Sequence, residues 1–136
     1  MSGAKEAVFA ILRDSSAVQA LAASRIFPNL IPQEDFDSTS QKPCVVYART
    51  GVNRQGLLCG TGKTEASSFR LDCYGRTYAA AEGLAAAVRA AITDYRGVAG
   101  GRLIHTIAID NEFDLLDPEP GLHRVTLLVT VWHDEP

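Results

Sequence analysis

The sequence predicts an α+β fold, in which a mostly antiparallel sheet of about four strands packs on one long helix and on short N-terminal helices. Two observations support this fold class. Four stretches have the composition or the apolar–polar alternation of strands with one buried face. Between the second and third stretch lies an alanine-rich segment whose apolar residues recur every three or four positions, which is typical of an amphipathic helix. A loop joins the last two strands, which favours antiparallel pairing.

The strand and helix in residues 67–95 form the centre of the predicted fold. Polar and apolar residues alternate here, so that Phe69, Leu71 and Cys73 share one face, opposite Arg70, Asp72 and Tyr74. Gly75 and Arg76 interrupt the strand, and the Thr77 hydroxyl is placed to cap a helix. That helix is expected over 77–95, with one apolar stripe: Ala81, Leu84, Val88, Ile92 and Tyr95.

The N-terminal sequence predicts two short helices, 4–12 and 17–23, which pack on the sheet. Their inward residues are expected to be Val8, Ile11, Leu12, Val18 and Leu21. Residues 25–28 predict a short extended piece, which Pro28 and Pro32 keep out of a sheet centre. Residues 33–42 are polar and lack periodicity, which indicates a loop.

A strand is predicted over 44–50, followed by a glycine-containing segment, 51–66, with an apolar tip at Leu57 and Leu58. Two interpretations of this segment stay open: a flexible hairpin arm between antiparallel strands, or a disordered loop. Long segments of either kind often carry function. We refer to residues 51–66 as the hairpin arm.

After the helix, three glycines predict a turn, and 102–110 predicts a strand with Leu103, Ile107 and Ile109 on one face. Residues 111–121, which contain four acids and two prolines, predict an acidic loop. The last strand is expected over 122–133. Its apolar face holds Val125, Leu127, Val129 and Val131, whereas Leu128 and Trp132 lie among threonines on the other face.

Composition limits the possible functions. A chain of 136 residues fits a single domain, 1–136. The net charge of −3 argues against a dedicated nucleic-acid binder. No apolar run approaches the ~20 residues of a membrane span, so we expect no membrane partner. The N-terminus lacks the pattern of a signal peptide, which predicts a protein made in the cytoplasm.

The candidate chemical motifs are weak. Residues 60–64, GTGKT, resemble the end of a P-loop, but Leu57 stands where that motif needs glycine, and a strand follows instead of a helix. The three cysteines form no close pair, and the three histidines share no metal-ligand spacing. The carboxylates of residues 110–119 lack the ligand order and the central glycine of a calcium loop. We therefore expect no catalytic residue, no metal and no cofactor.

The order of these segments resembles the phage tail completion family, also called tail terminator or head-to-tail joining proteins. The resemblance extends over nearly the whole chain. Its motifs are RIFP at 25–28, PCVVY at 43–47, FRLDCY at 69–74, the alanine-rich helix, DNEFD at 110–114, GLHRV at 121–125 and the final Trp132.

The resemblance implies a non-enzymatic virion protein that forms a ring, typically a hexamer. Such a ring caps the tail tube at its head-proximal end and joins it to the neck of a phage or a phage-derived gene transfer agent. The implied partners are further copies of the chain, the tail tube protein and the head–tail connector or neck proteins. Genomic DNA would pass through the ring without sequence-specific binding.

The residues themselves indicate three surfaces for such contacts: the hairpin arm, the acidic segment and the second face of the last strand. The expected contact residues are Arg49, Arg54, Leu57, Leu58, Lys63, Glu112, Asp114, Asp117, Leu128 and Trp132. Two alternatives are a small α+β module that binds a ligand without catalysis, and a nucleotide- or metal-dependent enzyme based on the GTGKT stretch.

Overall fold

A computed structural model describes residues 4–22, 25–28, 43–57, 60–93, 95–99, 101–116 and 123–134. These residues form three helices and one six-stranded sheet with the order β1-β2-β3-β6-β5-β4. The elements in chain order are α1 (Ala4–Asp14), α2 (Ser16–Ala22), β1 (Ile26–Pro28), β2 (Cys44–Leu57), β3 (Gly60–Gly75), α3 (Tyr78–Ile92), β4 (Gly97–Ala99), β5 (Arg102–Leu116) and β6 (His123–Asp134).

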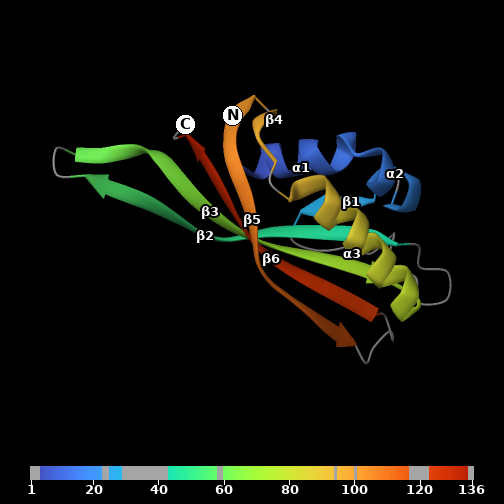
Figure 1. The fold of residues 1–136 in the computed structure, drawn as a ribbon. Coiled ribbons are helices and arrows are strands. Elements are labelled where there is room, and N and C mark those ends of the chain that lie inside the picture. The colour runs from blue at the N-terminus through green and yellow to red at the C-terminus, as the bar shows by residue number, and fades with distance from the viewer. Residues whose placement is uncertain are drawn as a thin grey trace.

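The three helices gather on one side of a strongly twisted sheet (Figure 1). Between the helices and the sheet lies one cluster of buried apolar residues. All three helices and all six strands contribute to it. As expected from the sequence, this cluster includes Leu84 and Val88 of α3, Leu71 of β3 and Val129 of β6. The opposite side of the sheet faces none of the three helices, and we call it the helix-free face.

The join between β3 and α3 follows the sequence closely. The Thr77 hydroxyl accepts a hydrogen bond from the Ala80 backbone N–H at 3.1 Å, which confirms the predicted N-cap. A Cβ at Gly75 would lie 2.7 Å from the Ala81 backbone nitrogen, so the close approach of the strand end to the helix requires glycine. The helix ends at Ile92, somewhat earlier than the predicted end at residue 95.

Replacing Thr77 with alanine should lower the free energy of unfolding by about 1 kcal/mol, because the Ala80 N–H loses its acceptor at the exposed helix start. Urea denaturation followed by circular dichroism measures this loss. Thr77→Ser, which keeps the hydroxyl, is the matched control and should unfold at nearly the wild-type urea concentration. Equal stability of the alanine and serine variants would contradict the cap.

The sheet differs from the predicted one in number and direction of strands. It has six strands instead of about four, and it is mixed, because β1 pairs with β2 in parallel. The two strands that the prediction lacks, β1 and β4, span only three residues each, too few to show a period of two. The extended piece before Pro28 lies at the sheet edge, as its prolines indicated.

Two side-chain assignments in the N-terminal and β5 regions were wrong. Leu21, expected to point inward, is 41% exposed on α2, whereas Val18 is buried. In β5, Ile104 is buried together with the predicted Ile107, whereas Leu103 is exposed. The cause in β5 is a register irregularity between Ile104 and Thr106, which reverses the alternation at one point.

Strand β5 also continues further than predicted. It pairs with β6 as far as Leu116, so the first half of the expected acidic loop, 111–116, is strand. Residues 117–121 of that expected loop lie outside the described residues.

Candidate interaction surfaces

The hairpin arm is built by β2 and β3, which pair from Cys44 and Tyr74 outward to Leu57 and Gly60. Strand β6 accompanies β3 only as far as Thr64. Beyond that point the arm is a two-stranded ribbon that projects away from the helices (Figure 1). Of the two interpretations left open by the sequence, the hairpin is therefore confirmed for the described residues.

The predicted contact residues in and next to the arm lie on two strands. Arg49 is exposed on β2, just before the first of two register irregularities, which increase the local twist. Arg54 and Leu57 belong to β2 and Lys63 to β3. Leu58 lies outside the described residues.

The structure of the arm also bears on the hypothesis that residues 60–64 bind a nucleotide. These residues form the beginning of β3, and the chain continues as strand to Gly75. A P-loop needs a strand before it and a helix N-terminus after it, where backbone N–H groups surround the phosphates. The structural context of that motif is therefore missing at GTGKT.

The acidic residues at the end of β5 are held by α3. The Glu112 carboxylate lies 2.6 Å from Nη1 of Arg89, and the Tyr78 hydroxyl donates a hydrogen bond to Asp114 at 2.8 Å. Hydrogen bonding to the carboxylates of Glu82 and Asp114 raises the pKa of Tyr78. Both Glu112 and Asp114 are exposed, so they present negative charge at the side of the molecule. Asp117 lies outside the described residues.

The helix-free face carries the apolar residues expected on the second side of β6. Leu128 stands in register between Arg70 of β3 and Asn111 of β5, and Trp132 stands between Ala66 and Thr106. Both Leu128 and Trp132 are half-buried in the single chain, less open than the sequence suggested.

Three further apolar side chains are exposed along the same side of the sheet. Phe113 of β5 is in register with Thr126 and is 37% exposed. Val98 and Leu103 are both exposed and directly opposite each other in the β4–β5 pair. Sequence reasoning missed these residues, although the alternation of Phe113 with Glu112 and Asp114 was a signal that this segment is a strand.

Asp72, in the middle of the helix-free face, is only 2% exposed. Its carboxylate accepts a hydrogen bond from the Thr126 hydroxyl at 2.7 Å and lies 3.1 Å from Nε of Arg70. A buried carboxylate needs such partners to offset its lost hydration. The hydrogen bond between Asp72 and Thr126 therefore favours the observed register of β3 against β6. Arg70 remains half-exposed and places a positive charge on this face.

A serine and a histidine also meet inside the sheet. The Ser67 hydroxyl lies 2.7 Å from Nε2 of His133, and Glu65 is opposite His133 in the β3–β6 pair. This distance is short enough for a nucleophile and its base. Ser67 and His133 are, however, only 1% and 2% exposed, so a substrate has no access to them. The cluster is a structural connection at the base of the hairpin arm.

Cysteine and metal chemistry find no support in the described residues. Cys44 and Cys73 are buried, as predicted, and burial, followed by the nearby Asp72, raises the pKa of the Cys73 thiol. Such a thiol is protonated and unreactive at neutral pH. The part of the chain that the structure describes contains no group of three or more potential ligands that could hold a metal ion.

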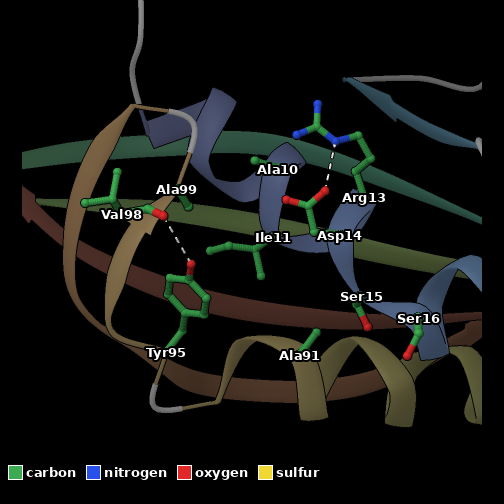
Figure 2. A pocket seen from close by; sticks show the side chains of 10 residues that line it. All are labelled: Ala10, Ile11, Arg13, Asp14, Ser15, Ser16, Ala91, Tyr95, Val98 and Ala99. Atoms are coloured by element: carbon green, nitrogen blue, oxygen red, sulfur yellow. Dashed lines mark hydrogen bonds and ion pairs between the residues drawn. The ribbon is translucent and has the colours of Figure 1, made fainter.

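A pocket of about 440 Å³ lies where α1, α2, α3 and β4 meet (Figure 2). The small apolar side chains of Ala10, Ile11 and Ala91 line it. Its charged residues, Arg13 and Asp14, bond to each other at 3.2 Å and are largely exposed. The Tyr95 hydroxyl, also in the lining, donates a hydrogen bond to the Val98 carbonyl at 3.4 Å, so both the charged pair and this hydroxyl bond within the chain, unlike the convergent polar groups of a specific ligand site.

Together, these features describe a small sheet-and-helix domain with a projecting arm and exposed apolar side chains. In the described part of the chain, no helix is both long and apolar enough to span a membrane.

A comparison with known protein families identifies the family of this chain. The model of the family described as Tail completion protein gp17 matches residues 6–134, and the chain belongs to that family. Its role is that of a structural protein of a virion.

A solved structure supports the same fold. A chain in a structure described as "Virion of native gene transfer agent (GTA) particle" superposes with a TM-score of 0.75 at 16% sequence identity. The match covers 94% of this chain and 92% of that chain. A comparison with curated proteins finds no match.

Proposed function

We propose that the protein forms a hexameric ring that caps the completed tail tube and joins the tail to the head of a phage or a gene transfer agent. The observation that carries this proposal is the hairpin arm. A two-stranded ribbon that extends beyond its own sheet has few stabilising contacts within its subunit, because isolated hairpins are marginal in water. An arm of this kind is suited to binding a neighbouring subunit or ring.

The three surfaces are assigned to different contacts. The arm, with Leu57 and Leu58 near its tip, binds the next subunit or the adjoining ring. Arg49, Arg54 and Lys63 pair with acids such as Glu112, Asp114 and Asp117 of a neighbour, which sets register and association rate more than affinity. The helix-free face, with Leu128 and Trp132, contacts the tail tube protein or the connector, and DNA passes through the ring without sequence-specific contacts.

Deleting the gene tests this function. Without the protein, heads filled with DNA and tails should accumulate separately, and some tails should exceed the normal length because nothing caps them. Electron microscopy of the lysate, with the gene restored on a plasmid as control, measures both effects. Particles that remain joined and infectious in the deletion strain would refute the proposal.

A further inference from the structure

Next to the short edge strand on each side of the sheet lies a long strand whose outer edge is paired, among the described residues, at only a few positions. Strand β1 covers Val45–Tyr47 of β2, and β4 covers Arg102–Ile104 of β5. Among the described strands none pairs with the outer edge of β2 from residue 48 to 57, or with that of β5 from residue 105 to 116. Open edges present rows of backbone N–H and C=O groups that can bind another strand.

The two open edges lie on opposite sides of the sheet, and two of their parts, 48–57 of β2 and 111–116 of β5, extend toward opposite ends. Ala48, Arg70, Leu128 and Asn111 form one row across β2, β3, β6 and β5. From this row, the edge of β2 continues toward the tip of the hairpin arm. The final part of β5, 111–116, has no register shift and continues from the same row in the opposite direction, away from the arm. In Figure 1 the arm and the end of β5 accordingly point away from each other.

The charges of the two edges are complementary. Asp110, Glu112 and Asp114 are exposed on β5, whereas β2 contributes the exposed Arg49 and, further along, Arg54. Pairing β5 with β5 would oppose like charges, and so would pairing β2 with β2. Only the combination of β2 with β5 places opposite charges together, which selects a head-to-tail contact between copies.

Strand direction is compatible with this contact. Within the sheet β2 and β5 run antiparallel, because three antiparallel pairings separate them. Copies related by rotation about a ring axis to which the strands are tilted, as in a barrel, keep β2 of one copy antiparallel to β5 of the next, and the tilt supplies the stagger that brings 48–54 opposite 111–116.

We infer that the open edge of β2 in one subunit forms backbone hydrogen bonds with the open edge of β5 in the next subunit, so that one sheet continues around the ring. The partner is a second copy of this chain, and the inference rests on the proposed ring. It adds a bonding mode and an orientation to that proposal, since arm-tip contacts alone require neither edge to pair.

Hydrogen exchange compares the free protein with the protein in purified tails. The amides in 48–54 and 111–116 that point to the open edges should exchange at least about tenfold more slowly in tails, because these edge groups become hydrogen-bonded. The buried strand β6 serves as the internal control. If rings are present in the tails but both edges exchange as in the free protein, the inference is wrong and the proposed function stands. If tails contain no ring, both are wrong.

Proline at adjacent positions provides a second test. Successive N–H groups of a strand point to opposite sides, so of Glu112→Pro and Phe113→Pro one removes an N–H directed at β6 and the other an N–H directed at the open edge. The variant that removes the N–H directed at β6 should have a lower melting temperature. The variant that removes the N–H directed at the open edge should melt near the wild type but fail in ring assembly. The controls are Glu112→Ala and Phe113→Ala. Normal assembly by the stable proline variant would overturn the inference.

Discussion

Replacing Leu84 with alanine should lower the free energy of unfolding by about 2–5 kcal/mol. Leu84 is fully buried on the inner side of α3, in the same cluster as Leu71 and Val129. Removing its side chain deletes apolar contacts and leaves a cavity that close-packed neighbours fill only in part. Domains of this size have total stabilities of roughly 5–15 kcal/mol, so the melting temperature should fall by roughly 10 °C or more.

The matched control makes the same substitution at an exposed site. Leu21→Ala on α2 should cost less than about 1 kcal/mol, because Leu21 already lies largely in solvent. Differential scanning calorimetry of both variants gives the comparison. If Leu84→Ala melted at the wild-type temperature, or if Leu21→Ala were as damaging, the packing of the helices on the sheet would be wrong.

Changing both Leu57 and Leu58 to serine should abolish head–tail joining and leave the fold intact. Among the described residues, the part of the arm between Thr64 and the turn pairs only within its own hairpin, so we expect substitutions near the tip to leave the core unchanged. Two leucines that are buried at a contact would stabilise it by about 3–6 kcal/mol, which corresponds to a large loss of affinity when they become serine. Joining is measured by adding the purified variant to separated heads and tails and counting infectious particles.

Two single substitutions separate the arm hypothesis from the nucleotide alternative. Lys63→Ala should leave joining nearly unchanged, although it would destroy a true P-loop. Leu21→Ser controls for a leucine-to-serine change at an exposed site outside the arm. Loss of joining in Lys63→Ala, together with normal joining in the double serine variant, would establish the nucleotide hypothesis and refute ours.

The elements with a clear period were predictable from the sequence. Strands β3 and β6 and helix α3 extend over enough residues to show their periods, and the Thr77 cap has a local signature. Strands β1 and β4 are too short for any pattern. The reversal at Ile104 depends on a bulge, and the continuation of β5 to Leu116 is a pairing with β6, a strand later in the chain.

The candidate surfaces were predictable in part for the same reason. Alternation along β6 revealed Leu128 and Trp132, because it requires only local sequence. The burial of Asp72 depends on Thr126, and that of Ser67 on His133, partners 54 and 66 positions away. Such pairs become visible only when strand register is known, and neither residue showed a signal of its own.

The central claim, a ring at the head-proximal end of the tail, is tested most directly by cryo-electron microscopy of purified particles. We predict one layer of closed density between tail tube and head into which the described fold fits, with each hairpin arm reaching the adjacent subunit or ring. Density for this fold at the distal tail tip, or its absence from joined particles, would contradict the account.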